Sequence, residues 1–377
     1  DVRVCNLSYL QTDWYIDQMR RPAYDSPSVP INWDRIDYVS GHNEAVYVRP
    51  DAMETVLNFY KQHPEEAKKE FGDNPYELKT ILAHWVRAPK DAGLQMIPTD
   101  SIVIKLDKEA IKRSGMLTPD SIPEYMHISL KGKSVLYKSE LMMLEMLANT
   151  NWERPMYMAI TVGPDNHLNL TDNFLQEGLA YRITPFNNTE LGRRIDTDKM
   201  YDNLMHKFKF GGIDNPDIYL DETALRMCDT HRRMFVQLAT QLIKEGKKDK
   251  ALEALDYCEK VIPSTTVPHD YIMSSSKEMA EDYMQLGQYK KAENILNALA
   301  NNAVEYITWY LSLNELQFAN SYENCMRYLY ILDDVCKTLS QMKGENGKVI
   351  DSATHYTDKF NQLYKLLEQR AGVASAQ

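Results

Sequence analysis

The sequence has 377 residues, of which 44% are hydrophobic and 26% charged, and this composition excludes a collagen-like, low-complexity or wholly disordered chain. The 43 basic residues against 54 acidic ones give a net charge of −11, which argues against nucleic acid as a partner because phosphate binding requires a basic surface. The richest apolar run, residues 141–148, is short and contains Glu145, so we predict no membrane span within this segment.

The first half alternates short apolar runs with helical patterns, which predicts an α/β domain over residues 1–215 with a mixed or parallel sheet and flanking helices. The chain begins in what reads as a strand already under way, so we expect that it is cut from something longer. A short helix should follow over 14–20, and another after Asp51. The strands predicted in this part are residues 2–7, 45–48, 101–106 and 126–130.

A strand–helix–strand order is clearest in the middle of this domain. A strand over 126–130, an amphipathic helix over 138–149 and a strand over 155–162 together predict a parallel crossover. A second passage, from a helix over 173–177 into a strand over 179–183, follows the same pattern.

The second half predicts an all-α, tetratricopeptide-like repeat domain over residues 216–377, because strand signals largely vanish there. Its repeat period is 41 residues rather than about 34, and we assign the excess to an insertion over 264–270. A third, degenerate helix pair is expected over 321–367, interrupted at 344–347. The frame of Ala239, Leu242, Gly246, Lys250, Ala251 and Leu255 recurs as Ala280, Tyr283, Gly287, Lys291, Ala292 and Leu296.

Motifs for catalysis or for metal and cofactor binding are missing from the sequence. The nine histidines are scattered without a zinc-binding spacing, and the five cysteines form no C-x-x-C pair, so we expect free, mostly buried thiols. Phosphate-binding and nucleophile-elbow motifs are absent as well. We therefore predict no catalytic residue, no metal site and no cofactor in this segment.

One ligand site is predicted from topology. If residues 2–7 form a strand of a parallel sheet, its carboxyl end delivers a set of polar and aromatic side chains to a loop, where open α/β sheets bind ligands. The alternative is that Thr12 or Asp13 caps the next helix while Trp14 packs beneath it. The candidate ligand-binding residues are Asn6, Ser8, Thr12, Asp13 and Trp14.

A second site is predicted on the helical half, because aromatic side chains bury a large area at low entropic cost and can stack on sugar rings or anchor peptides. Such a stripe can equally form the interior of a helix pair. The residues of this partner or glycan groove are Tyr283, Tyr306, Trp309 and Tyr310.

Residues 1–19 read DVRVCNLSYLQTDWYIDQM, and AVYV at 45–48, NWERPMYMAIT at 151–161 and LQEGLAYR at 175–182 follow. In these passages the chain resembles the soluble C-terminal part of the domain-of-unknown-function family 2723, bacterial multi-pass membrane proteins related to protein O-mannosyltransferases. In that family the soluble part follows a bundle of membrane helices, and the catalytic acids lie in loops of the membrane part. The resemblance therefore carries no catalytic residue over to this segment.

The resemblance implies a non-catalytic module of a membrane glycosyltransferase on the periplasmic face of the bacterial inner membrane. Its expected partners are the membrane-embedded N-terminal part of the same protein and an acceptor protein or glycan. Two alternatives stay open. One is a catalytic or sugar-nucleotide-binding α/β domain that uses the loop from Asn6 to Asp13, and the other is a free-standing helical glycan-binding protein.

Overall fold

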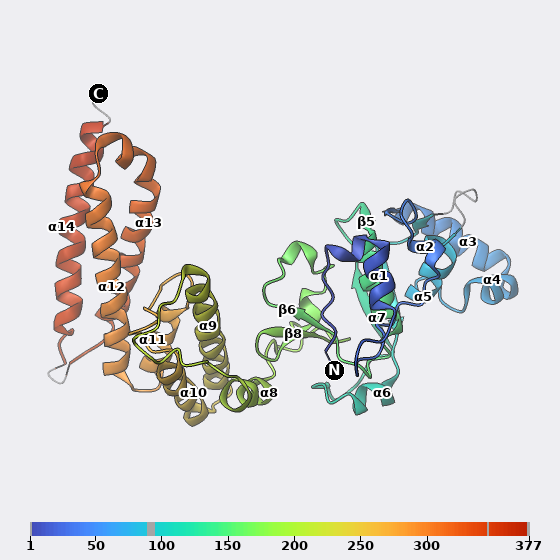
Figure 1. Ribbon diagram of the computed structural model, residues 1–377, viewed down its shortest axis with the longest axis horizontal. Helices are drawn as coiled ribbons and strands as arrows, with labels where there is room; N and C mark the ends of the chain where they lie inside the picture. The colour runs from blue at the N-terminus through green and yellow to red at the C-terminus, as the bar shows by residue number, and fades with distance from the viewer. Residues whose placement is uncertain (1, 89–94, 345–346, 375–377) are drawn as a thin grey trace. The chain divides into compact units, whose positions relative to one another are not determined.

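A computed structural model describes residues 2–88, 95–344 and 347–374 (Figure 1). The chain divides into two compact units, Asp1–Asp196 and Thr197–Gln377, and each is described by itself. Within the described residues, no helix is both long enough and apolar enough to cross a membrane.

The first unit is an α/β unit, as predicted, but its strands form three small sheets instead of one large one. The first sheet has the order β2-β1-β5, with β1 parallel to β2 and antiparallel to β5. The second pairs β3 with β4, and the third has the order β6-β8-β7, with all pairs antiparallel. The strands are β1 (Ala45–Val48), β2 (Met96–Ile97), β3 (Ser101–Lys105), β4 (Tyr125–Ser129), β5 (Val135–Tyr137), β6 (Tyr157–Ala159), β7 (Phe174–Gln176) and β8 (Ala180–Ile183).

The core of this unit is built around helix α7 (Lys138–Asn149), which is apolar on almost every side and buried accordingly. Its one buried acid, Glu145, accepts hydrogen bonds from the Asn32 backbone amide and the Trp33 indole, each at 2.9 Å. These bonds explain how a carboxylate is tolerated within an apolar helix. The other helices are α1 (Asp13–Met19), α2 (Arg35–Tyr38), α3 (Met53–Gln62), α4 (Pro64–Phe71), α5 (Leu78–Ile81) and α6 (Lys108–Arg113).

The predicted first strand is wrong. Residues 2–6 form no strand and Leu7 lies in a turn, and Val2 and Val4 are exposed. Their backbone bonds instead to the side chain of Tyr15, which accepts from the Asn6 amide at 2.8 Å and donates to the Val4 carbonyl at 3.2 Å. A side chain therefore replaces the neighbouring strand that a sheet would have supplied.

The predicted parallel crossover is also wrong, although its helix and both of its strands exist. Strand β4 pairs with β3, whereas β6 pairs with β8 in a different sheet. After α7 the chain passes through Asn151 and Trp152 with φ of +50° and +63°. These left-handed residues redirect it away from the β3–β4 sheet.

The helix predicted over 173–177 is a strand, β7, whose three residues are all buried. Such a short apolar run cannot be assigned to helix or strand from periodicity alone. Gly178, with φ of +137°, lies in the turn that leads directly into the antiparallel strand β8. The turn is thus an antiparallel connection and not a helix-to-strand passage.

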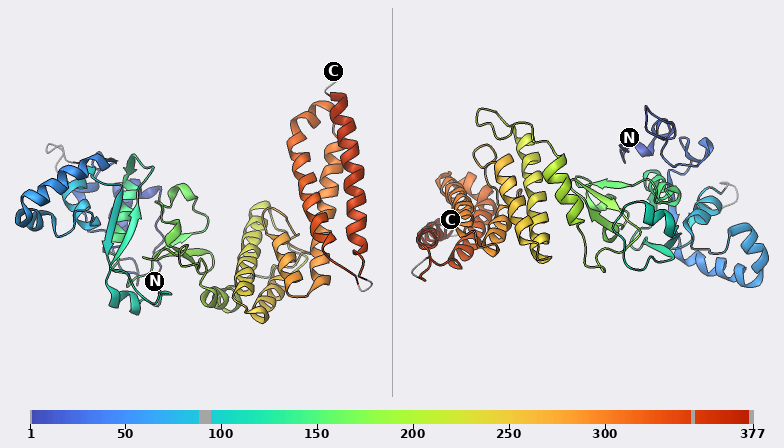
Figure 2. Two further views of the ribbon diagram at one scale, coloured as in Figure 1. Left: turned by 180° about the vertical axis from the view of Figure 1, so that it is seen from behind. Right: turned by 90° about the horizontal axis from the view of Figure 1, so that it is seen from below.

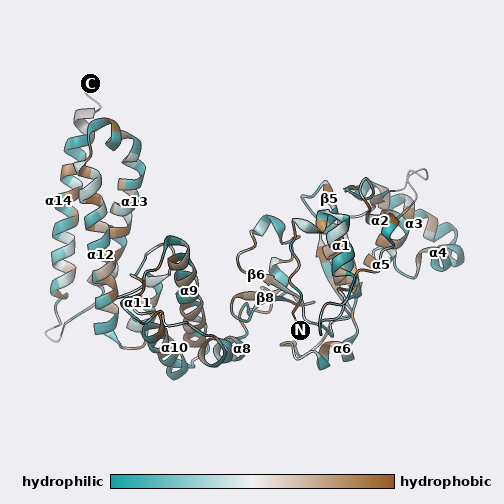
Figure 3. Ribbon diagram, viewed as in Figure 1, coloured by the Kyte–Doolittle hydropathy of each residue, from teal (hydrophilic) through white to brown (hydrophobic). Residues whose placement is uncertain are grey.

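The second unit is all-helical, as predicted (Figure 2). Helices α9 and α10 pack as one pair and α11 and α12 as the next, while α11 also contacts α9. Alternating hydrophilic and hydrophobic residues mark the amphipathic helices of this unit (Figure 3). Its helices are α8 (Thr197–Asp202), α9 (Glu222–Lys244), α10 (Lys248–Val261), α11 (Ser276–Gln285), α12 (Tyr289–Ser312), α13 (Glu315–Ser340) and α14 (Asp351–Ala374).

The repeat frame explains this pairing. Gly246 and Gly287 follow the first helix of each pair with φ of +77° and +75°, a conformation that glycine adopts at little cost at the end of a helix. The alanines of the frame, Ala239, Ala251, Ala280 and Ala292, have no exposed surface, so the paired helices approach closely at these positions. The predicted interruption at 344–347 falls between α13 and α14, and residues 345–346 lie outside the described part.

The predicted boundary between the two domains follows residue 215, whereas the compact units divide after Asp196. Residues 197–215 therefore belong to the second unit and not to the first. Within this segment α8 packs on α9, and Met200 is completely buried. The side chain of Thr197 donates to Glu245 at 2.9 Å, and Tyr201 donates to Glu253 at 2.5 Å. These contacts assign α8 to the helical unit, whereas the boundary at 215 stays a prediction about folding.

Candidate functional site

The five residues of the predicted N-terminal site lie near one another, but not at the end of a strand. Asn6 accepts from the Tyr9 amide at 3.2 Å, Thr12 donates to the Tyr9 carbonyl at 2.7 Å, and Asp13 accepts from the Trp14 amide at 2.7 Å. Ser8 precedes a 3-10 turn over 9–11 without capping it. The polar groups of this loop thus fix the local backbone.

The helix-cap alternative for this loop is not found either. Thr12 occupies the N-cap position of α1, yet its side chain makes no capping bond. Trp14 does not pack beneath the helix but is 55% exposed, with its ring 5.8 Å from Tyr9 and 5.5 Å from Tyr15. What the segment offers to a ligand is therefore the exposed faces of two aromatic rings.

Aromatic side chains gather more densely on the helical unit. Tyr306, Trp309 and Tyr310 lie on successive turns of α12, and Tyr328 joins them from α13. The rings of Tyr306 and Tyr328 stack at 4.4 Å with an angle of 14°, and those of Trp309 and Tyr310 lie 4.7 Å apart. We call these four residues the aromatic surface.

The aromatic surface combines a buried base with an exposed edge. Tyr310 is buried, whereas Tyr306 is 40% and Trp309 53% exposed. Burial and the neighbouring tyrosines raise the pKa of Tyr328 to about 12, so its hydroxyl stays neutral. Rigid rings with a polar tip are the side chains that most often anchor a binding partner.

Tyr283, the fourth residue of the predicted groove, does not join this surface. It lies on α11 with no exposed surface, and no ring contact links it to the other three among the described residues. Its hydroxyl donates to Asp256 of α10 at 3.0 Å. Tyr328, by contrast, was missed, since it lies on the next helix and only the pairing of α12 with α13 brings it into place.

The passages around residues 151–161 and 175–182 meet in the core of the first unit. Tyr157 of β6 donates to Glu177 at 2.6 Å, and the guanidinium of Arg182 lies 3.6 Å from the same carboxylate. Arg182 also donates to the Ser114 carbonyl at 2.9 Å. Glu177 and Arg182 are almost completely buried, so these residues hold β6, β8 and the chain after α6 together.

The cysteines and acids give no further site within the described residues. All five cysteines are free, and four of them are buried. Burial raises the pKa of the Cys325 and Cys336 thiols to about 11, which keeps them protonated and unreactive. In the part of the chain that the structure describes, no three His, Cys, Asp or Glu side chains are grouped so that they could hold a metal ion.

A small α/β unit followed by paired helices with an exposed aromatic surface defines a helical-repeat protein with an appended domain. The sequence model of TMEM260-associated domain 2 matches residues 1–199, which is just over half of the chain. The protein therefore belongs to the TMEM260-associated domain 2 family. This domain is linked to O-mannosyltransferase-like membrane proteins. No curated protein and no solved structure matches the chain.

Proposed function

We propose that this chain is a non-catalytic module of a membrane glycosyltransferase related to protein O-mannosyltransferases. It lies on the periplasmic face of the bacterial inner membrane, beside the membrane-embedded part of the same protein, and binds the acceptor polypeptide. The family membership supports the link to such membrane proteins. The narrower resemblance to family 2723 supports the bacterial, periplasmic setting.

The observation that carries the binding role is the aromatic surface. Tyr306 and Tyr328 stack on each other. One face of each ring is therefore covered, and the outer face and the edge remain for a partner. Trp309 adds a large exposed indole beside them. A polypeptide can pack its own apolar side chains on several such faces and edges at once. The aromatic surface thus supports an acceptor polypeptide as its occupant.

The test replaces Trp309 by Ala in the full-length protein in its native membrane and measures sugar transfer to the acceptor. Truncating an aromatic anchor costs about 2 kcal/mol of binding or more, so we expect acceptor glycosylation at limiting acceptor to fall at least about tenfold. Tyr330→Ala is the matched control, because Tyr330 is an exposed tyrosine of α13 outside the aromatic surface. Equal glycosylation by both variants and the wild type would contradict the proposal.

A further inference from the structure

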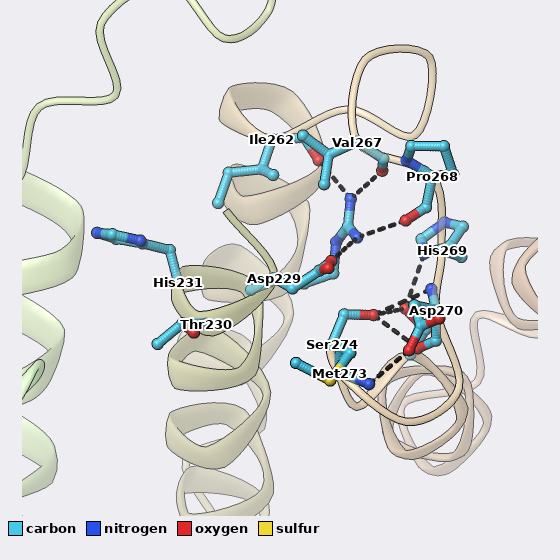
Figure 4. A network of polar contacts seen from close by, with 12 residues as sticks. Asp229, Thr230, His231, Ile262, Val267, Pro268, His269, Asp270, Met273 and Ser274 are labelled. Atoms are coloured by element: carbon cyan, nitrogen blue, oxygen red, sulfur yellow. Dashed lines mark hydrogen bonds and ion pairs between the residues drawn. The ribbon is translucent and has the colours of Figure 1, made fainter. Parts of the chain in front are cut away.

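The insertion over residues 264–270, which lengthens the repeat to 41 residues, is bonded to helix α9 by one buried side chain. Arg232 of α9 has no exposed surface. Its guanidinium donates to the carbonyls of Ile262 at 3.0 Å, Val267 at 2.7 Å and Pro268 at 3.2 Å (Figure 4). Burying a charge is costly unless it is bonded in this way, so the carbonyls of the loop satisfy a buried guanidinium.

The far end of the insertion is fixed by a chain of short polar contacts. His269 lies 3.0 Å from the hydroxyl of Ser276, which is 2.6 Å from the hydroxyl of Ser274. Ser274 in turn donates to the Asp270 carbonyl at 2.7 Å (Figure 4). The loop therefore presents His269 at a defined position.

This loop closes one side of a pocket of about 470 Å³. Its lining includes the buried residues His269, Tyr283 and Ile295. The volume is in the range of 300–1,000 Å³ that is typical of small-molecule sites.

The rim of the pocket carries charges of both signs. Asp256 of α10 accepts from Lys291 of α12 at 2.6 Å, so these two charges compensate each other. Asn294, one turn further along α12, is exposed and lines the pocket. Its side-chain amide makes no hydrogen bond with the described residues.

Glu259 carries a buried atom without a hydrogen-bond partner. Its Oε1 is buried without a hydrogen-bond partner, and its Oε2 lies 3.7 Å from Nε2 of His269. Burial and the nearby Arg232 lower the pKa of His269 to about 3, so the ring is neutral and this approach is not an ion pair. An acceptor left without a donor is costly. The buried Oε1 itself has almost no accessible surface, but the Glu259 side chain is 31% exposed, so a ligand hydroxyl would reach the carboxylate from its exposed side.

We propose that this pocket binds the ring of a neutral sugar. Sugar hydroxyls both donate and accept, and the pocket offers acceptors in Asp256 and Glu259 together with donors in Lys291 and Asn294. Asp256 and Lys291 already compensate each other, and an anionic ligand would be opposed by the remaining carboxylate, Glu259. The site is separate from the aromatic surface, so this inference goes beyond the proposed function and does not depend on it.

The test titrates the full chain with the neutral methyl glycosides of mannose, glucose, galactose and N-acetylglucosamine, using saturation-transfer NMR and calorimetry. At least one glycoside should bind. Glu259→Gln should raise its Kd about tenfold or more, because it weakens a charge-assisted hydrogen bond. Asn294→Ala should raise it about threefold to tenfold, and since Asn294 is exposed this variant should melt at the wild-type temperature.

Matched controls are Glu305→Gln and Asn302→Ala, which make the same chemical changes at exposed positions of α12 that do not line the pocket. Both should bind the glycoside like the wild type. Trp309→Ala should also bind it like the wild type, because Trp309 belongs to the aromatic surface, so this variant tests the proposed function without affecting the pocket. The inference is overturned if no neutral glycoside binds at about 20 mM, above the range of a millimolar Kd. The inference is also overturned if a glycoside binds but Asn294→Ala and Glu259→Gln leave its Kd unchanged. Binding of putrescine or inorganic phosphate instead of the neutral glycosides overturns it as well.

Discussion

Single residues decide how the insertion of the helical unit is held, and Arg232 is the clearest case. Removing its guanidinium leaves the buried carbonyls of Ile262 and Val267 without their donor and also breaks the partly buried bond to the Pro268 carbonyl. Arg232→Met should therefore lower the free energy of unfolding by about 3–5 kcal/mol, since breaking a buried charged network is among the most costly substitutions. Urea unfolding followed by circular dichroism measures the change.

The matched control is Arg226→Met on the same helix, where the arginine is exposed and pairs with Glu222. Its loss should change stability by at most about 0.5 kcal/mol. Equal effects of the two substitutions would show that Arg232 contributes no more than a surface charge.

Asp282 makes the stability of the helical unit depend on pH. It is 3% exposed and accepts from Thr240 at 2.7 Å, and burial raises its pKa from 3.8 to about 6. Because the folded pKa is the higher one, the favourable contribution of the protonated acid is present below pH 4 and is lost as the pH rises through about 6. Asp282→Asn should therefore stabilise the protein by about 1–2 kcal/mol at pH 7.5 and have little effect at pH 4. Denaturant titrations at the two pH values test this prediction, and an equal effect at both would contradict it.

At the scale of secondary-structure elements, the two glycines between paired helices should be equivalent. Gly246 and Gly287 both have positive φ, and a Cβ at either position would meet no atom within 4 Å. Replacement by Ala should thus cost about 1 kcal/mol at each position, all of it conformational. Gly163→Ala is the control, because Gly163 has an ordinary φ of −66° and equally open space. Unequal costs at the two repeat glycines, measured by urea unfolding, would argue against a shared structural role.

The same scale shows what the sequence could predict and what it could not. The helix pairs could be predicted from the helical periodicity of apolar residues and from Gly246 and Gly287, which end the first helix of each pair. Both features lie within a single repeat and need no knowledge of distant contacts. Strands β1, β3 and β4 were also predicted within a few residues. Their partners were not, because pairing is decided by non-local contacts such as those of β6 with β8. At the aromatic surface, spacing on α12 identified Tyr306, Trp309 and Tyr310, whereas Tyr328 required the packing of α12 on α13.

For the molecule as a whole, the contacts of α8 predict where the chain can be divided. A fragment of residues 197–377 retains the buried Met200 and the bonds of Thr197 and Tyr201. A fragment of residues 216–377 loses them and should be less stable by about 2 kcal/mol or more. Thermal and urea unfolding of the two fragments test this difference, and equal stability would place the folding boundary at 215.

The central claim is that this chain works as a module of a membrane glycosyltransferase. The most direct test is to blot carbonate-washed membranes and soluble fractions of the native organism with an antibody against residues 197–377. The account predicts retention in the washed membrane at a mass far above the 43.7 kDa of this chain. A soluble product near 43.7 kDa would contradict it.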